Sequence, residues 1–224
     1  MALLARGGVL PVITPAIMGI SFILVGWLVD PVSGIAPGLG ILMLMISAFF
    51  ANFWRDPDRP IPKEKGLIVS PADGHVMFAK RERATGRRPS KEEMDQSEDD
   101  EFTGTWFPEP CEKPLTFSTE QRYEPVPAGE ESENDVWRIA IFMSPLDVHV
   151  NRAPIAGKIT RMEHRTGKGK RRGPFVAAYR KESEFNERVR TLFEREDGLL
   201  VEVMQISGAL ARTIIPWTSE GSEM

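Results

Sequence analysis

The residues best suited to chemistry lie in residues 144–154, directly after the apolar run 136–143. The apolar run predicts a buried strand, and the Ser-Pro pair that closes it predicts a polar turn at the edge of a sheet. This turn carries His149, whose imidazole exchanges a proton near neutral pH, and Arg152, which can hold a carboxylate or a phosphate. Asp147 could orient or charge the imidazole. The alternative interpretation is a loop histidine with a structural role only.

A second polar turn follows another strand-like run. Residues 66–69 are mostly apolar, and residues 71–74 have the sequence Pro-Ala-Asp-Gly, which strongly favours a turn. By itself this pattern predicts an ordinary hairpin loop. It nevertheless supplies a second candidate group, the carboxylate of Asp73.

The two turns together resemble those of the phosphatidylserine decarboxylase family, in the short form found in many bacteria and archaea. Further matches to that family lie in residues 52–62, 156–159, 186–188 and 205–214. The resemblance covers most of the chain after residue 50, and several ordered motifs in one chain are a specific signal. It implies a lyase of phospholipid biosynthesis that converts phosphatidylserine to phosphatidylethanolamine. An archaeal ether lipid in place of the acyl ester is left open.

The resemblance also implies a cofactor and a set of site residues. Loss of carbon dioxide leaves a carbanion and needs an electron sink. The family makes that sink, a pyruvoyl group, from a serine in a Gly-Ser pair of its own zymogen, which leaves a new small subunit. Asp73 and His149 match catalytic positions, with His149 as proton carrier and Asp73 as its orienter or a helper in self-cleavage. Arg152, Asn151 and Lys168 are expected to hold the phosphate or carboxylate of the substrate.

Two features depart from the family pattern. Longer relatives have a second histidine at the position of Arg152. The pyruvoyl serine of the family follows the last matched motif, whereas the only Gly-Ser pair here, Gly221-Ser222, has no apolar strand before it. We therefore do not expect Ser222 to be the precursor, and we expect a truncated reading frame or a naturally inactive chain. An inactive lipid-binding relative on the same scaffold is the alternative function.

Other classes of protein fit less well. A metal-dependent hydrolase using Asp73, His75 and His149 would need a ligand spacing such as HExxH, which the three scattered histidines do not have, so no metal site is predicted. The single cysteine, Cys111, permits no internal disulfide and has no neighbouring histidine. The chain also lacks a dinucleotide or P-loop fingerprint.

The N-terminal part of the chain predicts a membrane anchor. Residues 9–29 and 35–54 carry no charge and are joined by a short turn, and at ~1.5 Å per residue each could cross a ~30 Å hydrocarbon layer. We therefore expect a two-helix transmembrane hairpin over residues 1–54. A buried core hairpin is the weaker alternative, and a cleaved signal peptide fits poorly.

The charges beside the two spans predict the orientation of the hairpin. Basic residues flank both spans: Arg6 before the first, and Arg55, Arg59, Lys63 and Lys65 after the second. By the positive-inside rule both ends face the cytoplasm, so residues 55–224 should form a cytoplasmic domain at the inner membrane.

The rest of the chain is rich in strand-like runs. It predicts a mainly β domain over residues 55–224, and the resemblance implies a compact β-barrel or sandwich. An acidic, proline-containing insertion at about 85–135 is expected to be exposed and partly disordered. The basic residues of the loop 165–173 suit an anionic membrane surface. Nucleic acid is the competing partner, but nucleic-acid motifs and interleaved aromatic residues are absent from the loop. A solvated loop without a partner is the alternative. A homo-oligomer is left open.

Overall fold

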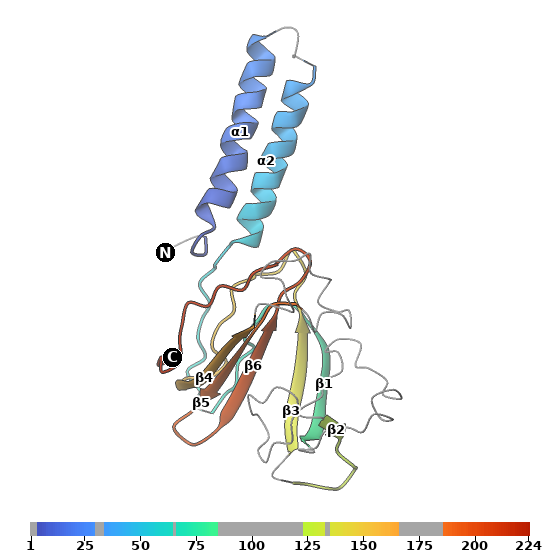
Figure 1. Ribbon diagram of the computed structural model, residues 1–224, viewed down its shortest axis with the longest axis vertical. Coiled ribbons are helices and arrows are strands. Elements are labelled where there is room, and N and C mark those ends of the chain that lie inside the picture. The colour runs from blue at the N-terminus through green and yellow to red at the C-terminus, as the bar shows by residue number, and fades with distance from the viewer. Residues whose placement is uncertain (1–3, 30–33, 65, 85–122, 133–134, 166–185) are drawn as a thin grey trace. The chain divides into compact units, whose positions relative to one another are not determined.

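The computed structural model describes residues 4–29, 34–64, 66–84, 123–132, 135–165 and 186–224 (Figure 1). The chain forms two compact units. The helical unit comprises Met1–Gly74 and Met143–Arg152, and the strand unit comprises His75–Phe142 and Ala153–Met224. Both turns that carry candidate catalytic residues therefore belong to the helical unit, although a long stretch of chain separates them.

Two apolar helices dominate the helical unit. Helix α1 spans Val9–Leu28 and helix α2 spans Ala36–Phe53, side by side and antiparallel in Figure 1. The helices predicted at 9–29 and 35–54 are thus confirmed almost to the residue. Uninterrupted apolar runs of this length favour helix over strand, and Pro37 in the first turn of α2 suits a helix start.

Small residues let the two helices approach closely. A side chain on Gly40 would meet the carbonyl oxygen of Gly19 at 2.6 Å, and one on Gly19 would meet that of Gly40 at 2.8 Å. Nearer the start of α1, Ser47 Oγ donates a hydrogen bond of 2.7 Å to the carbonyl of Val12. Backbone contact of this kind is the usual way in which helices associate in an apolar solvent.

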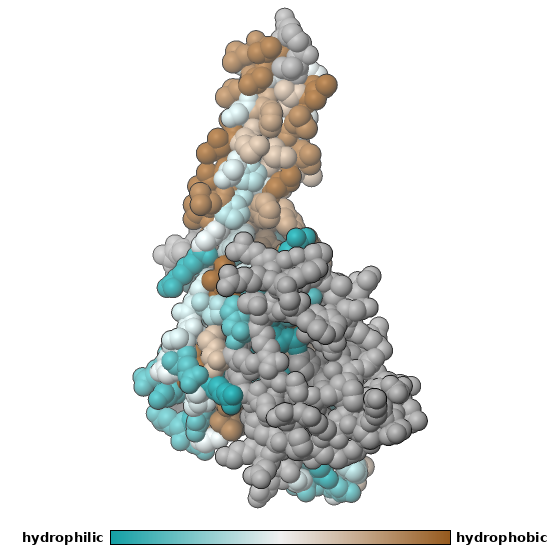
Figure 2. Space-filling view, in the orientation of Figure 1, coloured by the Kyte–Doolittle hydropathy of each residue, from teal (hydrophilic) through white to brown (hydrophobic). Residues whose placement is uncertain are grey.

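The outer faces of both helices are apolar and exposed, as the brown surface over α1 and α2 in Figure 2 shows. Leu10 is 74% exposed and Met45 is 66% exposed, which is opposite to the pattern of a core helix. Both helices are long and apolar enough to cross a membrane, by length and composition. At ~1.5 Å per residue, the 20 residues of α1 are about 30 Å long.

The first sheet of the strand unit is antiparallel, in the order β2-β1-β3. Its strands are β1 (His75–Ala84), β2 (Tyr123–Pro125) and β3 (Asp135–Phe142). Strand β2 lies within the stretch 85–135 that we predicted as an insertion, so the end of that stretch takes part in the fold. Residues 85–122 and 133–134 lie outside the described residues.

The second sheet is also antiparallel, in the order β4-β5-β6. Its strands are β4 (Lys158–Arg165), β5 (Arg188–Glu194) and β6 (Leu200–Ile206). Ile159 of β4 and Phe193 of β5 form a hydrophobic core with Ile155, which precedes β4. Partly buried side chains surround the core: Ala153, Met162, Leu199, Val201 and Val203. Burial of these apolar groups is the main stabilising contribution in this part of the unit.

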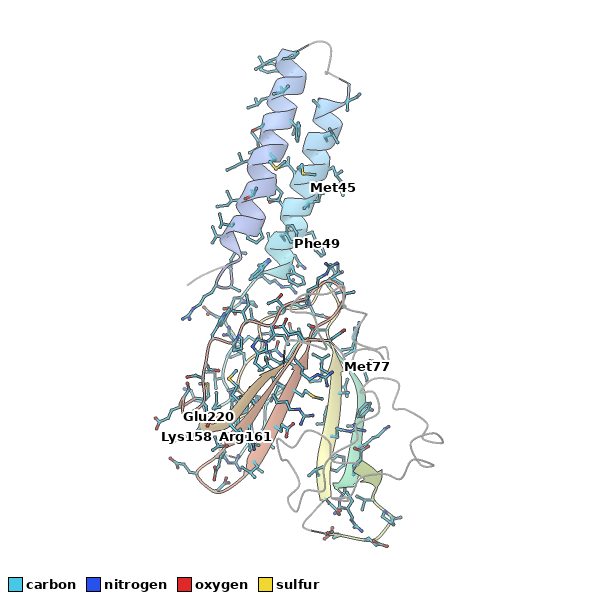
Figure 3. All side chains as sticks on the ribbon, in the orientation of Figure 1. Met45, Phe49, Met77, Lys158, Arg161 and Glu220 are labelled. Carbon is cyan, nitrogen blue, oxygen red and sulfur yellow. The ribbon has the colours of Figure 1, made fainter. Side chains whose placement is uncertain are left out.

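The last described residues add to the edge of β4. Gly157 and Met224 exchange backbone hydrogen bonds of 2.8 and 3.3 Å, and Ile159 exchanges bonds of 2.8 and 2.9 Å with Gly221 and Ser222. Figure 3 labels Glu220 close to Lys158 and Arg161 of β4. This segment therefore covers the outer edge of β4 at its beginning.

The structure supports the coarse form of the predicted fold, which is two apolar helices followed by antiparallel sheets. Closure of the sheets into a barrel or sandwich remains a prediction. The boundary between a membrane hairpin and a β domain at residue 54 also remains a prediction, because the compact units divide the chain at other positions.

Candidate active site

The turn before His149 is stabilised by two hydrogen bonds, one between backbone groups and one to the carboxylate of Asp147. Asp147 N donates a 2.9 Å hydrogen bond to the carbonyl of Ser144, and Ser144 N donates one of 2.7 Å to Asp147 Oδ2. Nδ1 of His149 lies 2.9 Å from the carbonyl oxygen of Asp147. Because a carbonyl only accepts, Nδ1 carries the proton of the neutral ring and Nε2 keeps the lone pair. Asp147 therefore orients the imidazole through its backbone carbonyl, and its charge also acts on the ring.

The imidazole of His149 stacks on the ring of Phe53, with ring centroids 4.0 Å apart and ring planes inclined by 30°. Burial of this half-buried imidazole lowers the pKa of His149 below its usual value. The hydrogen bond to Asp147 and the charge of Asp147 oppose this shift, and the positive charge of Arg55 adds to it. The ring is therefore mostly neutral near pH 7 and can accept a proton at Nε2.

Residues at the end of α2 also form hydrogen bonds with Leu146, at the start of the turn that carries His149. The carbonyl of Leu146 accepts a hydrogen bond of 2.8 Å from Arg55 Nη2 and a longer one of 3.4 Å from Asn52 Nδ2. Arg55 Nη1 in turn donates to the carbonyl of Asn52 at 2.9 Å. Sequence reasoning gave Asn52, Phe53 and Arg55 no role at the site. The only signal was their place in the 52–62 stretch that resembles the family.

The turn that carries Asp73 lies beside the His149 turn. Arg152 N donates a 2.9 Å hydrogen bond to the carbonyl of Pro71, and this bond joins the two turns. Gly74 has φ of +134°, a conformation that other residues rarely adopt, and it closes the Asp73 turn. Among the described residues, Asp73 forms an ion pair of 2.5 Å with Arg59 and has no hydrogen bond to His149. Its role as orienter remains a prediction.

Two guanidinium groups mark a candidate anion site. Arg152 pairs with Asp56, and Arg59 pairs with Asp73. The side chains of both arginines are 47% exposed, so each has donors left for a ligand. Asn151, next to Arg152, is half-buried. Lys168, the third predicted binding residue, lies outside the described residues.

The other histidines lie in the strand unit. His75 begins β1 opposite Phe142, and His164 Nε2 in β4 lies 2.8 Å from Oε1 of the buried Glu187. Within the described residues, no group of three His, Cys, Asp or Glu side chains is arranged to hold a metal ion. The alternative of a metal-dependent hydrolase using Asp73, His75 and His149 thus gains no support.

Ser222, which we do not expect to be the pyruvoyl precursor, lies in a turn beside Ser219. A precursor serine attacks the preceding carbonyl and needs a base beside its hydroxyl. Ser222 Oγ instead accepts a 3.2 Å hydrogen bond from Ser219 N and lies 3.5 Å from Ser219 Oγ. Among the described residues, no hydrogen bond joins this hydroxyl to a histidine or a carboxylate.

Known proteins resemble this chain over most of its length. The phosphatidylserine decarboxylase proenzyme of Symbiobacterium thermophilum is 32% identical over 187 residues, which cover 83% of this chain and 64% of that protein. The corresponding proenzyme of Streptomyces coelicolor is 34% identical over 192 residues, covering 86% and 61%. That of Thermobifida fusca is 34% identical over 186 residues, covering 83% and 58%.

The aligned part therefore spans between 58% and 64% of the length of these relatives. A model of the family described as phosphatidylserine decarboxylase matches residues 46–224. This match includes the end of α2, both candidate turns and the whole strand unit. The chain belongs to the phosphatidylserine decarboxylase family.

Proposed function

We propose that this chain forms the catalytic scaffold of a membrane-bound decarboxylase that converts phosphatidylserine to phosphatidylethanolamine. One observation carries the proposal. The helical unit brings the Asp73 turn and the His149 turn together, through the hydrogen bond between Arg152 N and the carbonyl of Pro71. A proton carrier, a carboxylate and exposed guanidinium groups then lie in one unit, which suits a substrate that carries a carboxylate, an ammonium group and a phosphate.

In this proposal His149 moves a proton. The imidazole is neutral near pH 7 because burial lowers its pKa, and Nε2 is the atom that can take up a proton and return it to the product. The stack with Phe53 and the contact with the carbonyl of Asp147 limit rotation of the ring. Asp73 assists His149 or the self-cleavage of the proenzyme.

The substrate headgroup is held by the guanidinium of Arg152, with Asn151 and Lys168 as further ligands. We add Arg59 to this set, because its side chain is as exposed as that of Arg152 and is paired with Asp73. A phosphate or carboxylate of the substrate could replace Asp56 or Asp73 as the partner of these arginines. The basic loop 165–173 would attract the protein to anionic lipids, although residues 166–173 lie outside the described residues.

The cofactor expected for the family is a self-derived pyruvoyl group, which supplies the electron sink for decarboxylation. We propose that Ser222 is not its source, because the hydroxyl of Ser222 is hydrogen-bonded to Ser219 in a turn and, in the described part of the chain, to no histidine or carboxylate. A small subunit that carries the pyruvoyl group is the expected partner. The protein as expressed in the cell should then contain a processing serine other than Ser222.

For the location, we propose the inner membrane, with α1 and α2 as a transmembrane hairpin and the residues after 54 as a cytoplasmic β-barrel or sandwich. The exposed apolar faces of both helices and their length support the membrane location. The basic residues beside the two helices support the orientation.

The experiment is a decarboxylation assay on membranes that contain the protein expressed from its native locus. Phosphatidylserine labelled at the serine carboxyl carbon should release labelled carbon dioxide and yield phosphatidylethanolamine. The His149→Gln variant should release labelled carbon dioxide at least about 10²-fold more slowly. Binding of phosphatidylserine without release of carbon dioxide would contradict the proposal and favour the inactive, lipid-binding alternative.

A further inference from the structure

Helix α2, which we propose to cross the membrane, ends at a residue that contacts the imidazole of His149. Phe53 is the last residue of α2, and its ring is the one that stacks on His149, at 4.0 Å between centroids. Phe49, one turn earlier on α2 (Figure 3), stacks on Phe53 with centroids 6.2 Å apart. A row of aromatic rings thus leads along the last turn of the helix to the candidate catalytic group.

The end of α2 also contacts the His149 turn at a second point, the carbonyl of Leu146. Asn52 Nδ2 and Arg55 Nη2 both donate to the carbonyl of Leu146, three residues before His149. A hydrogen bond from a charged guanidinium is stronger than one between neutral groups. The turn is therefore held at Leu146 by polar contacts and at His149 by ring contact, and both contacts come from residues 52–55.

The end of α2 is stabilised by contacts with the residues before and at the start of α1. Ala5 N donates a 2.7 Å hydrogen bond to the carbonyl of Trp54, and Leu4 and Arg55 form an isolated antiparallel bridge. Gly8 lies against Trp54, where an added side chain would meet Trp54 Cβ at 2.7 Å. The start of α1 and the end of α2 thus form one connected base for the turn.

We propose that the end of α2 is part of the active site, with Phe53, Asn52 and Arg55 as positioning residues for His149. This inference rests on the proposed function and deepens it. The position of His149 at the end of α2 also determines how deep in the membrane the reaction would take place. An apolar span that ends at Phe53 places His149 one ring contact from the boundary of the hydrocarbon layer, which is the depth of a phospholipid headgroup. The substrate can then react while its acyl chains stay in the bilayer.

The opposing interpretation is that Phe53 only packs against the turn. The two interpretations differ in what happens to the imidazole. A positioning ring controls the water around His149 and the direction of Nε2, so its removal changes the titration of His149 and the turnover rate. A ring that only packs affects the stability of the fold and leaves both quantities unchanged.

The test is an NMR titration of the full chain in lipid nanodiscs, with all histidines labelled. The His149 signal is assigned by its loss in His149→Gln, and His75 and His164 report on the fold of the strand unit. Phe53→Leu should move the pKa of His149 up toward the usual value of about 6.5. Phe53→Tyr keeps an aromatic ring and should preserve the wild-type titration. Phe50→Leu, on the same helical turn but outside the contact with His149, should also have no effect.

Activity is measured on the same variants in membranes from cells that express the protein from its native locus. Phe53→Leu and Asn52→Ala should lower kcat by about 10- to 100-fold with little change in KM, since a small misplacement of a reacting group has effects of this size. Phe53→Tyr should restore most of the rate. The proposal is overturned if Phe53→Leu changes neither the titration of His149 nor kcat, or if Phe50→Leu changes them equally.

The two proposals can fail separately. If the His149 pKa responds to Phe53→Leu as expected but no form of the protein releases carbon dioxide, the proposed function fails while the coupling between the helix end and the imidazole is supported. If wild type releases carbon dioxide but the Phe53 variants behave as wild type, the positioning role fails alone.

Discussion

His149 is the residue on which the proposed chemistry depends most. Its Nδ1 proton is held by the carbonyl of Asp147 and one ring face is covered by Phe53, which leaves Nε2 as the exchanging atom. The sequence predicted that Asp147 could orient or charge the imidazole, but only the structure shows that the backbone carbonyl of Asp147 is the hydrogen-bond partner that sets the tautomer. Its carboxylate instead accepts the backbone hydrogen bond from Ser144.

Replacing His149 with Gln should lower the decarboxylation rate by about 10²- to 10⁴-fold, the usual contribution of a positioned acid or base. Gln keeps a group that can donate to the carbonyl of Asp147, so the turn should survive. The measurement is release of carbon dioxide from phosphatidylserine, with binding to phosphatidylserine vesicles as the control for folding. Wild-type turnover by this variant would exclude His149 as proton carrier.

The lowered pKa of His149 predicts an acid limit to both stability and turnover. The unfolded chain takes up a proton near pH 6.5, whereas the folded chain does so only at lower pH. The stabilisation is therefore fully present above about pH 6.5 and is lost as pH falls toward the folded pKa. If neutral His149 acts as the base, kcat should fall over the same window. A rate that rises as the pH falls below 6.5 would contradict this assignment.

Arg152 should act in substrate binding more than in turnover. Arg152→Gln removes the charge, so KM for phosphatidylserine should rise at least about 10-fold, the scale of a lost charged hydrogen bond, while kcat changes less. Arg195→Gln is the matched control. Arg195 is also bound to a carboxylate, that of Asp197, but it lies in the strand unit. Equal effects of the two variants on KM would refute a specific role for Arg152.

At the scale of elements, the two helices could be predicted from sequence because long uncharged runs leave few alternatives. The short strand β2 could not, because its three residues follow an acidic stretch and its pairing with β1 is a long-range contact. The aromatic contact at the end of α2 was also missed. Nothing in the local pattern of residues 49–55 says which turn the helix end will meet.

Close packing of α1 on α2 yields a prediction with a matched control. Gly40→Ala should force the helices apart, because the new methyl group would meet the carbonyl of Gly19 at 2.6 Å. Gly38→Ala, two residues earlier, points into open space and should be neutral. Thermal unfolding of the detergent-purified protein measures the difference. Equal midpoints for the two variants would mean that the helices do not pack through Gly40.

Glu187 connects three parts of the strand unit. Its Oε1 accepts hydrogen bonds from His164 Nε2 at 2.8 Å and Ile214 N at 3.0 Å, and its carbonyl accepts one from Ser207 N at 2.8 Å. Glu187→Ala should cost about 1–3 kcal/mol of stability, since two partly buried donors, His164 Nε2 and Ile214 N, lose their acceptor. Glu187→Gln keeps an acceptor oxygen and should cost less. Equal losses in a denaturant titration would show that these hydrogen bonds contribute little.

At the scale of the whole molecule, the sequence predicted the two polar turns but only the resemblance suggested that they act together. Their meeting depends on single contacts such as Arg152 N to the carbonyl of Pro71, which no periodicity encodes. The ion pair of Arg59 with Asp73 has the same origin. Residues that form one unit in space come from two segments of the chain, Met1–Gly74 and Met143–Arg152.

The proposed orientation in the membrane can be tested with the single cysteine of the sequence, Cys111. A cytoplasmic domain predicts that a membrane-impermeant maleimide labels Cys111 in inverted inner-membrane vesicles and leaves it unlabelled in intact spheroplasts. Resistance of the protein to extraction at alkaline pH checks that the helices span the membrane. Labelling in intact spheroplasts would reverse the assigned orientation.

The most direct test of the account is the intact mass of the membrane-purified protein, expressed from its native locus with the downstream DNA included and treated with phenylhydrazine. We predict self-cleavage into two polypeptides, with a phenylhydrazine adduct on the smaller one, and no change in this pattern when Ser222 is replaced by Ala. A single uncleaved polypeptide without an adduct would contradict the account and leave a lipid-binding role as the better explanation.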